Sequence, residues 1–364
     1  MAALAFQNAY KTYENGTTSL TDFNWEIECG GFTVLLGPSG AGKSTVLRVI
    51  AGMESLTSGT LLLNGQPACS GAFGRDVAMM FQSYGLLPGL TVYHNLAYGL
   101  KLRKVCAADI DTRVREAAAL LGIEALLPKR TQKLSLMESR RVMLARLAVR
   151  RPALFLMDEP LSGLDMQERG ELCGEILRLH RVYPETTCIC ATGETETAAA
   201  FGKKIALLNG GRVVEEGLPQ DLYKNPQSLF TAAFFGDPPM NFFRAERVTV
   251  GVFPEDIRIT DTAYAENQTQ EYRSGDTVSS CCSKLPDRAE VVSADLTGDG
   301  AFLYLKIWEN EPYVAAHVKV NRQCGSFLVA GQIIRICFNP DKLYYFDADT
   351  GKRMPPNLLA TENN

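Results

Sequence analysis

Residues 32–50 read FTVLLGPSGAGKSTVLRVI, and this stretch decides the fold of the first part of the chain. It opens on the run FTVLL, which predicts a buried strand. A glycine-rich loop follows that matches the pattern G-x-x-x-x-G-K-[ST], and apolar residues at helical spacing come after it. A strand, such a loop and a helix in this order predict a phosphate-binding loop in an α/β domain. The loop comprises Gly37, Pro38, Ser39, Gly40, Ala41, Gly42, Lys43 and Ser44.

The residue types of this loop suit the binding of a phosphate chain. Glycine lets the backbone curve around phosphate oxygens and turn its N–H groups inward, and the following helix adds partial positive charge. We expect Lys43 to reach the β- and γ-phosphates and Ser44 to ligate Mg²⁺. A chance glycine-rich turn is the alternative, and the strand and helix on either side speak against it.

A second apolar run, LFLM at 154–157, ends in two acidic residues. Asp158 stands where a carboxylate can hold Mg²⁺ through water. Glu159 stands where a carboxylate can orient or deprotonate an attacking water. Two acids that merely end a strand are the alternative, which the phosphate loop disfavours.

The rest of the chain divides into two parts with different sequence patterns. Up to about residue 235, apolar runs alternate with amphipathic helices, which predicts a parallel sheet covered on both faces. From residue 236 on, short β-type runs separated by turns predict a small all-β domain at 236–364, with a polar surface insertion at about 261–287. The runs lie at 77–81, 188–191 and 205–208 in the first part, and at 248–252, 302–307, 314–320 and 333–338 in the second.

Composition narrows the class of protein. A length of 364 residues with 46% hydrophobic and 21% charged residues is typical of a globular chain of two domains. A net charge of −4 gives no general positive field, so we expect no nucleic-acid partner. The 10 Cys include the close pairs Cys188/Cys190 and Cys281/Cys282 but no Cys-x-x-Cys pair, so we expect structural thiols and no metal site. No secretory signal and no apolar run of membrane-spanning length is found, which favours a cytoplasmic protein.

Several further segments match one family in order along the chain. Tyr13 stands where that family has an aromatic ring on adenine, Gln82 matches its Q-loop glutamine, and Asp165 closes a segment, LSGLD, that matches its D-loop. Together with the phosphate loop, these segments resemble the ATP-binding subunit of an ABC transporter. Residues 82–102 and 234–242 are similar to carbohydrate importers of the maltose and glycerol-3-phosphate type.

The resemblance implies a P-loop NTPase fold: an ABC nucleotide-binding domain at 1–235 with a helical subdomain at about 88–150. The C-terminal region resembles the OB-like regulatory barrel of such subunits, known as TOBE. ATP and Mg²⁺ are the implied cofactors, with Thr45 among the nucleotide-binding residues and Gln82 serving both the metal and catalysis. It also implies ATP hydrolysis coupled to solute import. The implied partners are a second ATP-binding subunit, in a homo- or heterodimer, two transmembrane permease subunits and an extracellular solute-binding protein. The chain would then lie peripherally on the cytoplasmic face of the membrane.

The segment that the family uses to contact the partner's ATP is altered here. Residues 134–138 read LSLME where the family has Leu-Ser-Gly-Gly-Gln, so that Ser135 is kept and both glycines are lost. Leu136 and Met137 add bulk where glycine would allow close approach of the backbone. Glu138 adds negative charge, which we expect to oppose a nearby phosphate.

A second departure is Gly193, which stands where the family has its switch histidine. Glycine has no side chain with which to contact the γ-phosphate, and losing one aligned donor costs about 10²–10³ in rate. We therefore expect low ATPase activity from the isolated chain. Two hypotheses stay open: an ATP-hydrolysing subunit for solute import, with carbohydrate the expected class, or a hydrolysis-impaired scaffold or regulatory subunit paired with an intact paralogue.

Overall fold

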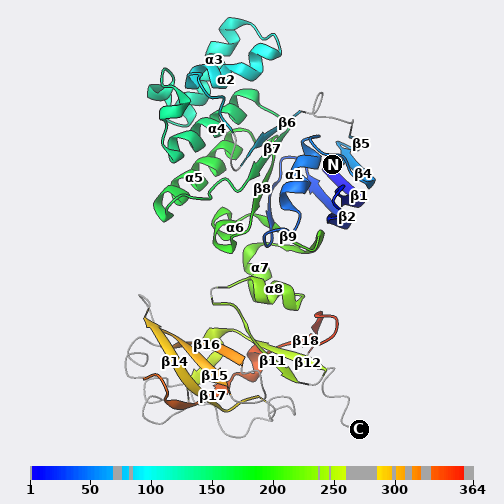
Figure 1. The fold of residues 1–364 in the computed structure, drawn as a ribbon, viewed down its shortest axis with the longest axis vertical. Helices are drawn as coiled ribbons and strands as arrows, with labels where there is room; N and C mark the ends of the chain where they lie inside the picture. The colour runs from blue at the N-terminus through cyan, green and yellow to red at the C-terminus, as the bar shows by residue number, and fades with distance from the viewer. Residues whose placement is uncertain are drawn as a thin grey trace. The chain divides into compact units, whose positions relative to one another are not determined.

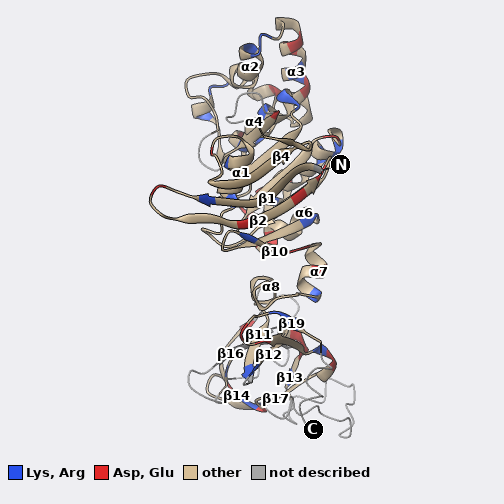
Figure 2. Ribbon diagram, turned by 90° about the vertical axis from the view of Figure 1, so that its right-hand side faces the viewer, with Lys and Arg blue, Asp and Glu red and all other residues tan. Residues whose placement is uncertain are grey.

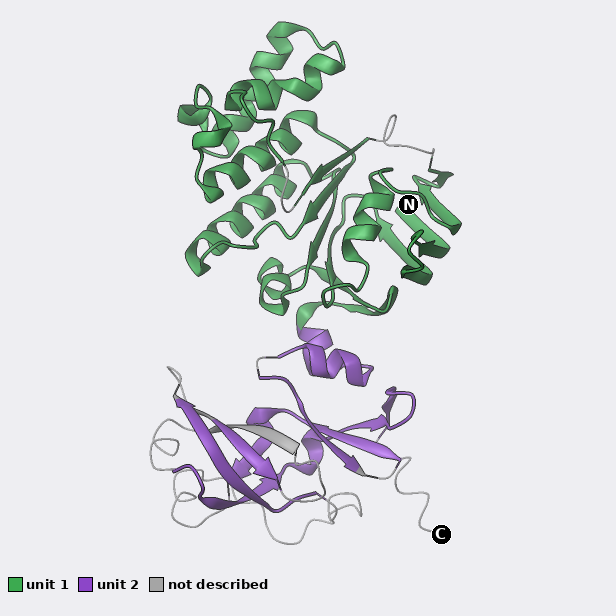
Figure 3. Ribbon diagram, viewed as in Figure 1, with its two compact units in different colours: residues 1–219 green, residues 220–364 purple. Residues whose placement is uncertain are grey.

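The computed structural model of the chain describes residues 2–68, 76–81, 85–236, 238–245, 247–259, 285–296, 301–307, 314–320 and 329–355. It divides into two compact units, Met1–Pro219 and Gln220–Asn364 (Figure 3). This division lies earlier than the expected boundary at 235/236, because α7 (Pro219–Lys224) and α8 (Leu229–Phe234) pack on strands of the second unit. Most of the expected insertion, from 260 to 284, lies outside the described residues.

A six-stranded sheet forms the centre of the first unit, in the order β10-β9-β3-β8-β7-β6. Its neighbours from β9 to β6 are parallel, and β10 joins the edge in an antiparallel hairpin. Strands β3, β7 and β8 are buried at every residue, as predicted for the doubly covered centre of a parallel sheet. The strands are β3 (Phe32–Leu36), β6 (Val77–Met80), β7 (Leu154–Asp158), β8 (Thr187–Thr192), β9 (Lys204–Asn209) and β10 (Arg212–Gly217).

A second, antiparallel sheet packs near helix α1 (Lys43–Ile50), which follows the phosphate loop. Its order is β2-β1-β4-β5, and Asn64 and Gly65 form the tight turn between β4 and β5 with φ of 48° and 75°. One core unites this sheet, α1 and the parallel sheet around Phe23, Leu47 and Ile189. The strands are β1 (Ala2–Thr12), β2 (Thr18–Glu28), β4 (Ser58–Leu63) and β5 (Gln66–Pro67).

Helices gather beside the other edge of the parallel sheet (Figure 1). Helices α2, α3 and α4 pack on one another, and α4 also contacts β6. Helix α5 packs on α4 and leads back to β8. The helices are α2 (Val92–Leu102), α3 (Ala107–Leu120), α4 (Leu136–Arg150), α5 (Met166–Val182) and α6 (Thr195–Phe201), with short 3₁₀ turns η1 (Glu124–Leu126) and η2 (Thr131–Lys133).

The second unit contains two antiparallel sheets, in the orders β11-β12-β18-β19 and β13-β17-β14-β15-β16. Their apolar residues share one core around Val250, Leu303 and Ile334. The four β-type runs predicted here are strands. The strands are β11 (Asn241–Ala245), β12 (Val248–Val252), β13 (Ile257–Ile259), β14 (Arg288–Leu296), β15 (Ala301–Ile307), β16 (Val314–Val320), β17 (Ile333–Phe338), β18 (Tyr344–Asp347) and β19 (Arg353–Met354), with turns η3 (Pro254–Asp256) and η6 (Pro340–Lys342).

Charged residues of both signs are interspersed along each unit (Figure 2). Among the described helices, none has the length and apolar character needed to cross a membrane. Cys173, Cys188 and Cys190 are buried, and burial raises the pKa of the Cys188 thiol to about 12. Such a thiol stays protonated and unreactive at neutral pH. Cys281 and Cys282 lie outside the described residues, and no metal-binding cluster occurs among those described.

His180, near the end of α5, has contacts whose contribution to stability can be tested. The Nε2 atom of His180, near the end of α5, lies 3.0 Å from the carbonyl oxygen of Gly30, so this nitrogen carries the proton that it donates. The ring also meets Phe32 edge-on, at 5.5 Å between centroids. Burial lowers the pKa of His180, although the Gly30 hydrogen bond acts in the opposite direction.

We expect His180 to make stability depend on pH. Because its pKa is lower in the folded state, its contribution is complete above its unfolded value of about 6.5 and declines as the pH falls below that value. His180→Gln keeps a donor for Gly30 but does not titrate. The free energy of unfolding in urea should therefore fall more from about pH 7.5 to 5.5 in the wild type than in the variant. Equal falls would contradict the prediction.

Candidate nucleotide-binding site

The phosphate loop passes through a space too narrow for side chains at two of its glycines. A Cβ on Gly37 would collide with the carbonyl oxygen of Leu208 on β9. Gly42, the N-cap of α1, has a φ of 106°, and a Cβ there would lie 2.6 Å from the carbonyl oxygen of Ser19. Both positions therefore require glycine.

Lys43 folds back over this loop. Its Nζ donates to the carbonyl oxygens of Gly37 at 2.7 Å and Pro38 at 3.1 Å. Burial lowers the pKa of Lys43, while the carboxylates of Glu159 and Asp158 act to raise it. The hydrogen bonds of this buried cation go to uncharged carbonyl oxygens, so an anion beside Nζ would stabilise it further, and the site favours phosphate oxygens there.

Asp158, the last residue of β7, reaches the start of α1. The Ser44 hydroxyl donates to its Oδ1 at 3.2 Å, so the two predicted Mg²⁺ ligands lie together. Burial raises the pKa of Asp158, whereas Ser44, Arg48 and Lys43 act to lower it. A hydroxyl and a carboxylate are oxygen ligands of the type that Mg²⁺ prefers, and the donor set fits that ion.

Glu159 adopts an unusual backbone conformation, with a φ of 47°, which is costly for a residue other than glycine. Its amide donates to the carbonyl oxygen of Ala191 at 2.9 Å, and its carboxylate is hydrogen-bonded by Thr192 and the backbone of Gly193. Burial raises the pKa of Glu159, although Lys43 and these hydrogen bonds act to lower it. A raised pKa brings a carboxylate closer to the range in which it accepts a proton efficiently at neutral pH.

Lys43, Ser44 and Glu159 line one cavity of about 320 Å³, and Asp158 is hydrogen-bonded to Ser44 of that lining. Gly193 belongs to it: a Cβ there would lie 3.5 Å from the Gly37 carbonyl oxygen and 3.7 Å from both Glu159 Oε1 and Lys43 Nζ. A Cβ at position 193 would thus be in ordinary van der Waals contact with the loop and the acid. The cavity is lined by Ser19, Ser39, Gly40, Gly42, Lys43, Ser44, Thr45, Glu159 and Gly193.

Comparison with known proteins identifies the class to which this site belongs. The ABC transporter family matches residues 20–162. MsmK of Streptococcus mutans, a multiple sugar-binding transport ATP-binding protein, is 36% identical over 379 residues, covering 96% of this chain and 99% of MsmK. The chain belongs to the ABC transporter family of ATP-binding proteins. It is therefore an ABC-type ATPase with the P-loop fold of that family.

Two further comparisons agree with this family. The sn-glycerol-3-phosphate import ATP-binding protein UgpC of Rhodopseudomonas palustris is 35% identical, over 97% of this chain and 100% of UgpC. The structure of CbiO1 from Clostridium perfringens, part of an ABC transporter complex, matches with a TM-score of 0.56 and 26% identity over 62% of this chain and 91% of CbiO1. These ABC proteins are named for transport, so the alternative of a scaffold subunit finds no support in them.

The altered ABC signature segment, residues 134–138, begins α4 with a capping box between Ser135 and Glu138. Ser135 caps the helix by accepting from the Glu138 amide at 3.1 Å, and Glu138 Oε2 accepts from the Ser135 amide at 2.8 Å. Lys129 Nζ lies 3.0 and 2.9 Å from the two carboxylate oxygens, and this contact lowers the pKa of Glu138. The negative charge that the sequence leads one to expect at this helix end is therefore paired with a cation. Of the two added apolar side chains, Met137 is buried and Leu136 is 47% exposed.

Of the remaining predicted residues, Asp165 and Tyr13 have polar contacts within the chain. Asp165 caps α5 by accepting from the Glu168 amide at 2.8 Å. The Tyr13 hydroxyl lies 3.0 Å from Thr45 Oγ1. Gln82 lies outside the described residues. The partner of Glu138, Lys129, was not predicted; the Ser-x-x-Glu spacing at 135–138 is the signal that could have revealed the cap.

Glu194, next to the missing switch histidine, is already engaged elsewhere. The guanidinium of Arg169 on α5 donates to its two oxygens at 2.7 and 3.3 Å, and Thr197 donates at 2.8 Å. Glu194 thereby joins α5 to α6. Its carboxylate is a poor substitute for a group that must face a phosphate, since both charges are negative.

We expect Lys43→Ala to weaken MgATP binding by at least about tenfold, because it removes the charge-assisted contacts of the buried ammonium. Isothermal titration calorimetry of the full chain measures this directly. Lys101→Ala, on the exposed side of α2, is the matched control and should bind as the wild type does. Unchanged affinity in Lys43→Ala would show that nucleotide does not use this loop.

Proposed function

We propose that this chain hydrolyses MgATP at the phosphate-loop cavity to drive the import of a carbohydrate through partner membrane subunits. The observation that carries the proposal is that two separate segments of the chain meet at one cavity, Lys43 and Ser44 from the phosphate loop and Asp158 and Glu159 from the end of β7, with Asp158 hydrogen-bonded to Ser44. The name of MsmK, a multiple sugar-binding transport ATP-binding protein, supports carbohydrate as the solute class, and the name of UgpC, an sn-glycerol-3-phosphate import ATP-binding protein, supports import.

The proposed chemistry follows from the positions of these side chains. Backbone N–H groups of the loop and Lys43 hold the phosphates, and Ser44 and Asp158 hold Mg²⁺, which neutralises charge on the phosphates when bound. Glu159 orients the attacking water and receives its proton, a role that its raised pKa favours. We place Tyr13 on the nucleobase, Gln82 near the metal, and Ser135 and Asp165 toward a second ATP-binding subunit.

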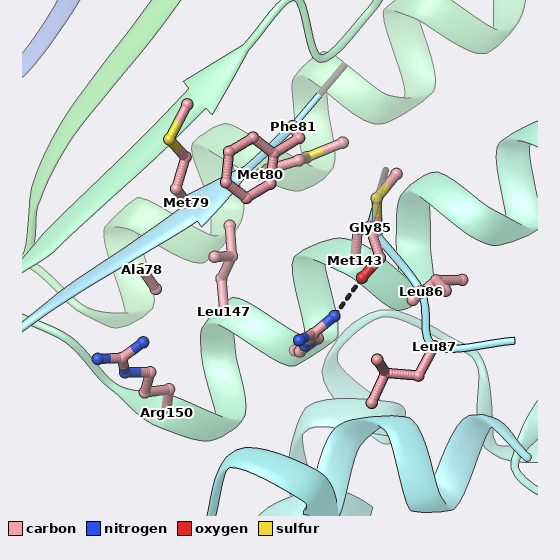
Figure 4. Close-up of a pocket in the computed structure, with 11 residues that line it drawn as sticks. Ala78, Met79, Met80, Phe81, Gly85, Leu86, Leu87, Met143, Leu147 and Arg150 are labelled. Carbon is pink, nitrogen blue, oxygen red and sulfur yellow. Dashed lines mark hydrogen bonds between the residues drawn. The ribbon is translucent and has the colours of Figure 1, made fainter. Parts of the chain in front are cut away.

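A separate cavity is our candidate for the contact with a membrane subunit (Figure 4). It measures about 300 Å³ and lies between β6, residues 85–87 and α4. Apolar side chains, among them Met80, Phe81 and Leu147, form much of its lining, and Arg146 donates to the carbonyl oxygen of Gly85 at its rim. Phe81 in its lining directly precedes Gln82 in the sequence, and Gly85, Leu86 and Leu87 belong to the segment that resembles the permease-contacting region of sugar importers. We propose that an apolar segment of a permease subunit occupies it.

The proposed assembly contains two ATP-binding subunits, two permease subunits and an extracellular solute-binding protein, with this chain on the cytoplasmic face. Residues from 236 on would form the regulatory TOBE barrel. The two sheets with one shared core support that proposal. The domain boundary that we propose follows the compact units, at 219/220.

The proposed function can be tested by uptake in cells that lack their own copy of this chain. We expect wild-type chain to restore uptake of at least one labelled carbohydrate and Glu159→Gln to reduce it by about 10²-fold or more, since the water loses its base. Purified Glu159→Gln should still bind MgATP. Full uptake with this variant, or no carbohydrate whose uptake depends on the chain, would contradict the proposal.

The hydrolysis rate should be limited by the missing side chain at position 193. Because a Cβ fits there beside Glu159 and Lys43, we expect Gly193→His to raise kcat of the purified chain by about 10–100-fold. Gly170→His on α5, where a Cβ meets nothing within 4 Å, is the matched control. A wild-type rate already at about 1–10 s⁻¹, with no gain in Gly193→His, would show that a backbone donor replaces the histidine.

A further inference from the structure

Tyr13 contacts helix α1 and the segment that follows it. Its hydroxyl donates to Glu54 Oε2 at 2.7 Å and lies 3.0 Å from the hydroxyl of Thr45, the residue directly after Ser44. Burial raises the pKa of Tyr13, so the phenol keeps its proton and donates at neutral pH. The side chain is half-buried, and these contacts define its position.

Glu54 is itself held by cations. Arg48 Nη1 lies 3.4 Å from its Oε1, and Lys11 Nζ lies 3.8 Å from its Oε2. The side chains of Lys11 and Glu54 are only 14% and 17% exposed, so solvent competes little for their contacts. Such a carboxylate is a fixed acceptor for the Tyr13 hydroxyl.

Lys11 also acts on the Tyr13 ring. Its ammonium stands over the ring at 4.9 Å from the centroid and donates to the carbonyl oxygen of Ser55 at 2.9 Å. An ammonium at this distance attracts the π-face of tyrosine. With that face occupied, a planar ligand can stack on the opposite face only.

We infer that Glu54 and Lys11 are positioning residues that fix Tyr13 as a platform for the nucleobase before ATP arrives. This inference rests on the proposed binding of ATP at the neighbouring phosphate loop. A ring ordered in advance avoids the entropy cost of ordering it on binding. The effect belongs to the base alone, because neither Glu54 nor Lys11 is among the groups that line the phosphate cavity.

The experiment compares two ligands of the full chain by isothermal titration calorimetry. MgATP has a base, and magnesium tripolyphosphate has the phosphates without one. We expect Tyr13→Ala to weaken MgATP binding by about 5- to 100-fold through lost stacking, and Tyr13→Phe, which keeps the ring, by about 2- to 10-fold. Tripolyphosphate binding should stay unchanged in both variants.

A double-mutant cycle then tests the contact itself. Glu54→Leu should weaken MgATP binding by about the same factor as Tyr13→Phe, and the double variant should show no further loss, because both variants remove the shared Tyr13–Glu54 hydrogen bond. Lys11→Met should weaken MgATP binding in the same selective way. Tyr10→Phe is the control, since Tyr10 lies on β1, three residues before Tyr13, and is 38% exposed.

The outcomes separate this inference from the proposed function. If Tyr13→Ala weakens MgATP selectively but Tyr13→Phe and Glu54→Leu bind it as the wild type does, the positioning inference is overturned and the platform remains. If Tyr13→Ala leaves MgATP binding unchanged, the proposed role of Tyr13 fails as well. Equal losses for both ligands would show that Tyr13 supports the phosphate loop through Thr45, which also overturns the inference.

Discussion

The first unit depends on three backbone segments that meet without room for side chains. The phosphate loop at Gly42, strand β2 at Ser19 and the β9–β10 turn at Gly211 approach so closely that a Cβ on Gly42 or Gly211 would lie 2.6 or 2.5 Å from the Ser19 carbonyl oxygen. Backbone hydrogen bonds join the same segments, from Gly211 to Ala41 at 3.2 Å and from Thr21 to Gly211 at 3.1 Å. This junction ties the antiparallel sheet to the parallel one, and it places the loop at the carboxyl end of β3.

Burial around that junction sets the electrostatics of the site. Desolvation lowers the pKa of Lys43 and raises the pKa values of Asp158 and Glu159, while the opposite charges of these groups limit the shifts. The three groups are thus buried charges that depend on one another. A magnesium-bound nucleotide brings both a cation for the acids and anions for the lysine, so its binding stabilises the buried charges of both signs.

The parts of the fold set by local pattern could be predicted from the sequence. The run at Phe32–Leu36 and the pattern around Lys43 predict β3, the loop and α1, because apolar periodicity and glycine requirements act within a few residues. The carboxylates of Asp158 and Glu159 could be placed because the ends of parallel strands share one edge. The sequence did not show that Lys129 pairs with Glu138 or that Arg169 pairs with Glu194, because these partners come from other elements. The sequence also did not show where the second unit begins. By sequence α7 and α8 fit the helices of the first unit, and only their packing assigns them to the second.

The capped start of α4 has a consequence for how the helix forms. In a helix end that binds an anion, the free N–H groups are completed by the ligand, and the first turn becomes more ordered when the ligand is present. Here Ser135 and Glu138 complete each other's amides, and Lys129 balances the charge. Nucleation of this turn is therefore encoded in the chain itself. The first turn of the helix thus finds its hydrogen-bond partners and its counter-charge within the chain, without a subunit or a nucleotide.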